Sequence, residues 1–206
     1  MEENATKEVL DYFRTNIFEA FSAYNAWKII FLSKSETVVP KEMAEKYVEV
    51  QNYHKDFFIT TERALLTNFV LLSLHSFDKR DDSFSLYKVD EPATEKFISD
   101  NKETIEQLIK LRHKLFAHRD HKLKITEFQI PSVEKLDTYF KNLIDFYNKK
   151  TQSLLSSTTL FTNAVEIKRD VESLLQNLYR GEKIRKLAIS IEWEWEKNLK
   201  KACDVI

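Results

Sequence analysis

Arginine, lysine and histidine side chains are concentrated in the segment LIKLRHKLFAHRDHK, residues 108–122. Residues 110–124 include six lysines and arginines and three histidines, against the single carboxylate of Asp120. Guanidinium groups match the geometry of phosphate oxygens, and imidazole is the side chain that exchanges protons near neutral pH. The formal net charge of the whole chain is −1, so a surface that attracts nucleic acid must be local. This segment is a candidate for such a surface.

Arg112 occupies a position that helical periodicity assigns to an apolar residue. In a helix of about 100° per residue, Arg112 lies near the middle of an apolar arc of about 160° formed by Ile105, Leu108, Ile109, Leu111, Leu115 and Phe116. Two interpretations are open. In the first, the guanidinium reaches solvent from the edge of the stripe or pairs with a buried carboxylate such as Glu62 or Asp78. In the second, it belongs to a functional site.

His118 is the candidate functional partner of Arg112. It falls about 120° from Arg112 around the same helix, just outside the apolar arc. One helix face cannot hold both side chains together. They converge if the end of the helix unwinds, or if two copies of the helix meet across a dimer interface.

The segment RHKLFAHRD resembles the signature of the HEPN superfamily. In that family an arginine, often followed directly by a polar residue, is separated by four to six residues from a histidine near the end of a core bundle helix. Arg112, His113 and His118 match this pattern, with five residues between arginine and histidine. The order of TTERALLTNFVLLSLHSFDK, SFSLYK and LRHKLFAHRD is also similar to the AbiU-type branch, which is linked to bacterial abortive phage infection. The resemblance covers about residues 50–150 and extends to the rest of the chain only in helical content.

The resemblance implies a helical bundle that forms a homodimer and carries a metal-independent endoribonuclease site without a cofactor. RNA would be cleaved through its own 2′-hydroxyl. His118 is expected to transfer protons, and Arg112 to hold the charge that builds on phosphorus. A dimer would bring two arginines and two histidines to one shared cleft, which accounts for an arginine on an apolar stripe. Phage defence or toxin activity, with an antitoxin or another regulatory partner, is compatible with this assignment.

Neighbouring residues are expected to support the site. His113 could orient Arg112 or contact RNA, and Arg119 could bind phosphate. Asp120 could fix the tautomer of His118; a branch of the superfamily that is paired with a nucleotidyltransferase antitoxin has a modified tyrosine there, so that form of control is not expected. An ordinary surface or helix-end role is also open for each of these side chains. The candidate RNA-binding lysines are Lys110, Lys114 and Lys122.

Several residues are compatible with other chemistry. HRD at 118–120 also opens the protein-kinase catalytic loop, but the asparagine and the glycine-rich loop that kinases need are missing from the sequence. Trp193 and Trp195 could stack bases, although such residues on a terminal helix more often pack. His54 and His75 are expected to be core or capping residues. A zinc or manganese site is an alternative for four side chains whose angles scatter around the helix: His113, His118, Asp120 and His121.

The rival function is a non-catalytic HEPN-like module that binds RNA, a nucleotide or a toxin partner through the same basic cleft. Such a module needs Arg112 and the other cations, but it does not need proton transfer by His118. Binding and cleavage must therefore be measured separately to distinguish the two functions.

The composition predicts an all-α fold. The chain has 206 residues, of which 43% are hydrophobic and 13% aromatic, enough for one sizeable core. One glycine and three prolines leave little material for hairpin turns. We expect a single domain over residues 1–206, an HEPN-like bundle of long antiparallel helices. Its core is predicted at about 41–155, with an N-terminal helix at 1–33 and additional C-terminal helices at 160–204 packing on it.

Helical periodicity and the positions of proline and glycine divide the chain into six predicted helices. Pro40 is a common first helical residue, and Pro131 forbids a continuing helix while Ser132 can cap the next one. Gly181 is predicted to end a helix, and a polar loop is predicted at 78–92. The predicted helices cover about residues 7–32, 41–77, 92–118, 133–155, 160–179 and 183–202.

The first residues and the cysteine count favour a reducing compartment. The segment MEENATKEVLDYF is acidic where a signal peptide is basic and then apolar, so no secretion signal is predicted. Cys203 is the only cysteine, which leaves no internal disulfide. The apolar run ALLTNFVLLSLHSF is too short and too interrupted by polar residues to span a bilayer, and it is predicted to be a buried core helix. We therefore expect a cytoplasmic protein without membrane contact.

Overall fold

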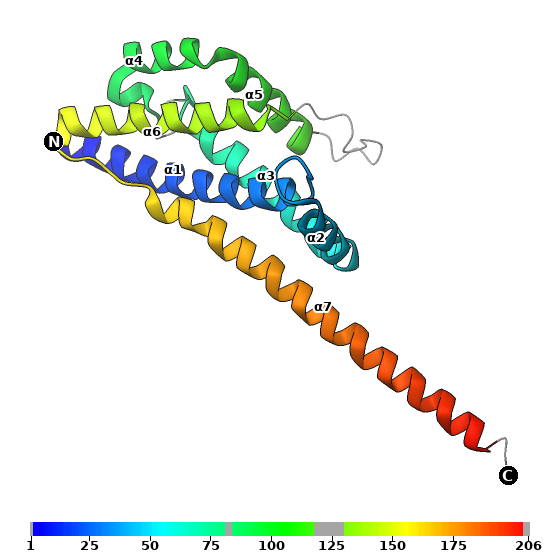
Figure 1. Cartoon of the computed structure of the whole chain (residues 1–206). Helices are drawn as coiled ribbons and strands as arrows, with labels where there is room; N and C mark the ends of the chain where they lie inside the picture. The colour runs from blue at the N-terminus through cyan, green and yellow to red at the C-terminus, as the bar shows by residue number, and fades with distance from the viewer. Residues whose placement is uncertain (1, 81–83, 118–129, 204–206) are drawn as a thin grey trace. The chain divides into compact units, whose positions relative to one another are not determined.

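The structure is a computed structural model that describes residues 2–80, 84–117 and 130–203, with side chains described for 6–80, 84–114 and 130–197. Within these residues every regular element is an α-helix, so the predicted all-α fold is confirmed (Figure 1). The helices are α1 (Glu2–Leu32), α2 (Lys41–Tyr53), α3 (Lys55–His75), α4 (Tyr87–Asp100), α5 (Lys102–Ala117), α6 (Val133–Leu155) and α7 (Thr162–Cys203).

The chain divides into two compact units. The first contains residues 1–28 and 60–167, and the second contains residues 29–59 and 168–206. Each unit is described by itself, and the single domain expected over residues 1–206 stays a prediction.

The first unit is built around stacked aromatic side chains. Tyr24 of α1 stacks on Phe140 of α6 with ring centroids 4.8 Å apart, and it meets the edge of Phe69 of α3 at 5.6 Å. All three side chains are fully buried. Such ring contacts stabilise a core beyond the area that they remove from water. α1, α3 and α6 are therefore joined by one aromatic centre.

Polar contacts at the edge of this centre show that α1 and α6 are antiparallel. Near the end of α1, the Tyr24 hydroxyl donates to Asp137 Oδ1 at 2.8 Å, and the Lys28 ammonium donates to Asp137 Oδ2 at 2.6 Å. Asp137 lies in the first turns of α6, and Figure 1 shows the two helices side by side. Burial and the adjacent Asp137 carboxylate raise the pKa of Tyr24 above its ordinary value. The tyrosine therefore stays a neutral donor.

α6 begins and ends where its sequence predicts. The Ser132 hydroxyl accepts a hydrogen bond from the Lys135 backbone N–H at 3.3 Å, as the predicted N-cap should. Ser156 ends the helix in the left-handed conformation, with φ 51°. The short connection at 156–161 then leads to α7.

The predicted helix at 41–77 is two helices in the structure. His54 leaves the helical conformation, with φ −103° and ψ 39°, and separates α2 from α3. The expectation of one uninterrupted helix was wrong here because neither proline nor glycine marks the break.

The region predicted to be a loop at 78–92 becomes helical earlier, at Tyr87. Asp90 interrupts the helix with φ −162° and ψ 94°, and its carboxylate accepts from the Ala93 backbone N–H at 3.0 Å. Pro92 thus stands in a first helical turn, where its missing N–H costs nothing. Asn101 then separates α4 from α5, so the single helix predicted from residue 92 was also wrong.

α7 runs through Gly181, which the sequence predicts as a helix end. Gly181 has no positive φ. The left-handed conformation that makes glycine a helix terminator is therefore absent at this residue. The two predicted C-terminal helices are one helix.

Among the described residues, α3 is the one helix with the length and the apolar composition that crossing a membrane requires. Four of its apolar side chains join the core of the first unit, whereas Phe57, Ile59 and Leu71 are exposed. The Ser73 carbonyl accepts a hydrogen bond from the buried Tyr139 hydroxyl at 3.3 Å. One face of α3 is therefore in the core, but only 28% of its apolar window is buried, so the prediction of a buried core helix holds for that face alone. The core residues of α3 are Leu66, Phe69, Val70 and Leu74.

Candidate functional site

The apolar stripe of α5 faces the core of the first unit. Ile105, Leu108 and Leu111 are buried, and Ile109 packs against the same core. These contacts confirm the periodicity predicted for residues 105–111. Leu115 and Phe116 are outside the described side chains.

Arg112 is half-buried beside this stripe. Within the described residues its guanidinium makes no hydrogen bond or ion pair, so neither Glu62 nor Asp78 is its partner. The carboxylate of Asp78 binds the guanidinium of Arg80 instead, at 2.7 Å. The intrachain carboxylate that would explain Arg112 as a structural residue is not found in this part of the chain. A route to solvent along the edge of the stripe remains compatible with its half-burial.

Three further side chains of the basic segment in α5 lie in solvent. Lys110, His113 and Lys114 are all exposed. Lys110 and Lys114 are four residues apart and so stand one above the other on the helix surface. These side chains therefore lie on the solvent-exposed surface of α5.

The other half of the predicted site lies outside the described residues. It consists of His118, Arg119, Asp120 and Lys122, together with His121 of the alternative metal site. The approach of Arg112 to His118 therefore stays a prediction. The same holds for the orientation of His118 by Asp120.

Among the described residues, no group of three or more histidine, cysteine, aspartate or glutamate side chains could hold a metal ion. His113 is the one ligand of the alternative zinc or manganese site that these residues include. The alternative site therefore stays open as a prediction, and its test is chemical.

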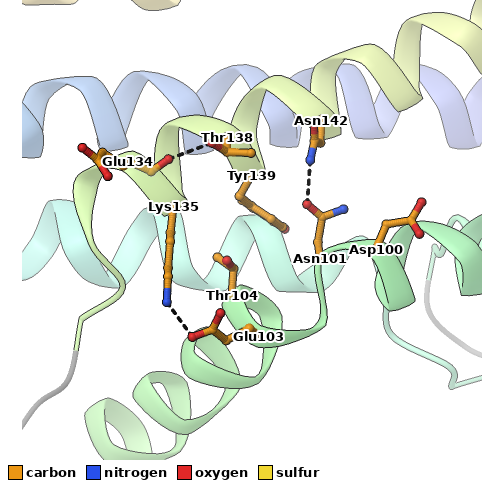
Figure 2. Close-up of a pocket in the computed structure, with 9 residues that line it drawn as sticks. All are labelled: Asp100, Asn101, Glu103, Thr104, Glu134, Lys135, Thr138, Tyr139 and Asn142. Carbon is orange, nitrogen blue, oxygen red and sulfur yellow. Dashed lines mark hydrogen bonds and ion pairs between the residues drawn. The ribbon is translucent and has the colours of Figure 1, made fainter.

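An open groove of about 360 Å³ lies where the α4–α5 junction meets α6 (Figure 2). Asn142 donates to Asn101 Oδ1 at 2.8 Å, and Lys135 donates to Glu103 Oε1 at 2.5 Å. The sequence analysis did not identify this groove, because its polar side chains come from three helices and form no local motif. The lining residues are Asp100, Asn101, Glu103, Thr104, Glu134, Lys135, Thr138, Tyr139 and Asn142.

The charge of this groove is unsuited to RNA. Three carboxylates line it against one lysine, and that lysine is already paired with Glu103. A phosphate backbone would be repelled. Burial raises the pKa of Tyr139 above its ordinary value, so this side chain cannot serve as a base at neutral pH. The basic surface of α5 is therefore the better candidate for a phosphate-containing ligand.

Comparison of the chain with protein-family models, with curated proteins and with solved structures finds no match. The functional argument therefore rests on the residues of the chain itself. Its strongest element is the unusual position of Arg112.

Proposed function

We propose that the chain is a homodimeric, metal-independent endoribonuclease of the HEPN type, acting in the cytoplasm of a bacterial cell in phage defence or as a toxin. The observation that carries the proposal is the half-burial of Arg112, whose guanidinium has no hydrogen-bonding or charged partner among the described residues. Partial burial of an unpaired cation costs free energy. A ligand that supplies oxygens to this guanidinium recovers that cost.

RNA phosphate is the ligand that fits Arg112 best. The planar guanidinium donates two parallel hydrogen bonds to phosphate oxygens. Lys110 and Lys114 are exposed on the opposite side of the same helix, about 160° from Arg112, and add to the positive charge of this segment. Arg119 and Lys122 follow in the sequence and extend the basic segment. The binding of RNA should therefore weaken steeply as salt concentration rises.

The cleavage step assigns different tasks to two residues. His118 accepts the proton of the 2′-hydroxyl and returns a proton to the leaving 5′-oxygen. Arg112 stabilises the charge that develops on the phosphorus oxygens. His113 orients Arg112 or contacts RNA, and Asp120 orients His118. The expected product is a 2′,3′-cyclic phosphate.

The homodimer completes the site in this proposal. Arg112 and His118 are about 120° apart around one helix, so two α5 helices that meet across a two-fold axis can place an arginine of one copy near a histidine of the other. An interface of this kind should bury roughly 1,200 Å² or more. An antitoxin or another regulatory partner that covers the shared cleft would block the activity.

Incubation of the purified chain with total RNA, with and without EDTA, tests this function. Cleavage should proceed in EDTA and should leave cyclic phosphate ends. Arg112→Gln should abolish it, while Arg169→Gln, which changes an exposed arginine of α7, should not. Loss of cleavage in EDTA with recovery in zinc or manganese would favour the histidine and aspartate metal site instead. If no variant cleaves RNA and Arg112→Gln alone loses RNA binding, the non-catalytic module is the correct assignment.

A further inference from the structure

The part of α7 that follows Gly181 carries large apolar side chains in solvent. Ile184, Ile191 and Trp195 are 68%, 66% and 68% exposed. With Ala188, which is also exposed, they are spaced by four, three and four residues, the alternation of a coiled-coil seam. At about 100° per residue the four side chains fall within about 60° of one another. We call these four residues the α7 seam.

The α7 seam lies opposite the face that α7 uses within the second unit. Glu182 binds Arg185 at 2.8 Å and His54 at 3.6 Å, and Lys186 pairs with Glu49 of α2. Glu182 and Lys186 lie about 160° away from the centre of the seam around the helix. The contacts of α7 with α2 are thus made on one side, and the seam on the other side is left without cover in its own unit.

The charges beside the α7 seam change sign along the helix. Basic residues precede its midpoint and acidic residues follow it. Lys183, Glu192 and Glu194 are exposed and make no ion pair within the described residues. The basic residues beside the seam are Lys183 and Arg185, and the acidic ones are Glu192, Glu194 and Glu196.

This order of charges makes the seam complementary to itself in one orientation. When two copies run antiparallel about a point between residues 189 and 190, Ile184 faces Trp195 of the second copy and Ala188 faces Ile191. The basic end of each helix then meets the acidic end of the other. A parallel pair would place glutamates against glutamates, which is repulsive. Packing and charge therefore select the same arrangement.

We propose that the α7 seam binds the α7 seam of a second copy of this chain in an antiparallel helical pair. The α7 seam spans twelve residues, 184–195, and is about 18 Å long, so the contact is smaller than a standard stable interface and depends on protein concentration. The inference does not rest on the proposed ribonuclease activity, because it uses a different helix. If the α5 dimer also forms, two different two-fold contacts assemble more than two chains.

A matched pair of isoleucine substitutions tests the contact. Ile191→Glu places a charge in the seam, whereas Ile189→Glu places the same charge on the opposite side of α7, at a side chain that is 50% exposed. Light scattering over a range of concentrations should show the assembly mass of the first variant falling to half that of the wild type, with no change in the second. Equal masses for both variants and the wild type would overturn the proposal. Because both residues are exposed, helicity measured by circular dichroism should be unchanged in both.

Disulfide formation tests the orientation. Ile184→Cys and Trp195→Cys are made in separate chains that also carry Cys203→Ser, so that each chain has one cysteine. In the antiparallel pair these positions face each other, so oxidation should link the chains only when the two variants are mixed. Residues 184 of two copies would stand about 16 Å apart along the helix, too far for a disulfide. Linkage within each variant alone, or no linkage in the mixture, would contradict the antiparallel pair.

Discussion

α6 and the part of α7 that carries the seam are both amphipathic helices, yet only α6 buries its apolar face within the chain. Phe140 and Leu143 of α6 are fully buried in the core of the first unit, whereas Ile191 and Trp195 of α7 are mostly exposed. Apolar spacing is present in both helices. The difference shows that such spacing predicts a partner surface without saying whether the partner belongs to the same chain.

The charged side chains of the two helices differ in the same way. In α6, Asp137 forms an ion pair with Lys28 of α1 at 2.6 Å, and Lys150 forms one with Asp90 of α4 at 2.5 Å. Lys183 and Glu194 of α7 have no such partners among the described residues. The apolar side chains of the α7 seam, together with Lys183 and Glu194 beside it, are therefore available to another molecule.

The same substitution in the two helices should have very different effects on stability. Leu143→Ala removes a fully buried side chain of α6 and should lower the free energy of unfolding by about 2–5 kcal/mol. Leu187→Ala, at an exposed leucine beside the α7 seam, should change it by no more than about 0.5 kcal/mol at low protein concentration. Urea denaturation measures both values. Equal losses would mean that the exposed face of α7 is covered within its own chain.

A smaller effect is expected at the polar contact between α4 and α6. Asp90→Ala removes both the capping hydrogen bond from the Ala93 N–H and the ion pair with Lys150. It should lower the free energy of unfolding by about 1–2 kcal/mol at pH 7. Asp145→Ala on the exposed face of α6 is the control, with an expected change within about 0.5 kcal/mol.

The deficit of Asp90→Ala should depend on pH. The Lys150 ammonium and then the Ala93 N–H lower the pKa of the Asp90 carboxyl below its ordinary value. A lowered pKa in the folded state adds stability above the unfolded pKa of about 4 and loses it as pH falls through the folded pKa. The difference between wild type and variant should therefore shrink in urea titrations at pH 3. If the loss of stability in Asp90→Ala is the same at every pH, the effect comes from helix capping alone and the charge of Asp90 contributes nothing.

The smallest expected change distinguishes a continuous α7 from two shorter helices. A Cβ added at Gly181 meets no atom within 4 Å, and the residue lies inside the helix. Gly181→Ala should raise the free energy of unfolding by about 0.5–1 kcal/mol. If Gly181 instead ended a helix in the left-handed conformation, alanine would lower stability, and the same denaturation experiment would show it.

The sequence was sufficient for the fold class and for the inner face of several helices. The composition, with one glycine, predicted a helical protein, and Ser132 was correctly identified as a cap. The apolar spacing of α5 correctly placed Leu108 and Leu111 in the core. These features depend on local propensity and periodicity, which a single sequence contains.

Helix ends without a strong local signal were not predictable. His54 and Asn101 interrupt helices although neither residue forbids a helix, and Gly181 continues one although glycine often ends it. Contacts with other helices decide such cases, since propensity differences are small. The groove at Asn101 was missed for the same reason, because its lining is assembled from three helices.

For the candidate site, the sequence identified the exposed lysines and the unusual arginine of α5. The half-burial of Arg112, and its lack of a carboxylate partner among the described side chains, required three-dimensional information. The roles of Arg112 and His118 rest on the resemblance to the HEPN signature and stay predictions.

Separate measurements of RNA binding and RNA cleavage for His118→Ala and Arg112→Ala test the central claim most directly. His118→Ala should keep RNA affinity and the dimer while cleavage falls by about 10²- to 10⁴-fold. Arg112→Ala should lose cleavage and also weaken binding, with a shallower dependence on salt because one phosphate contact is removed. Cleavage by His118→Ala at the wild-type rate would contradict the assignment of the catalytic site.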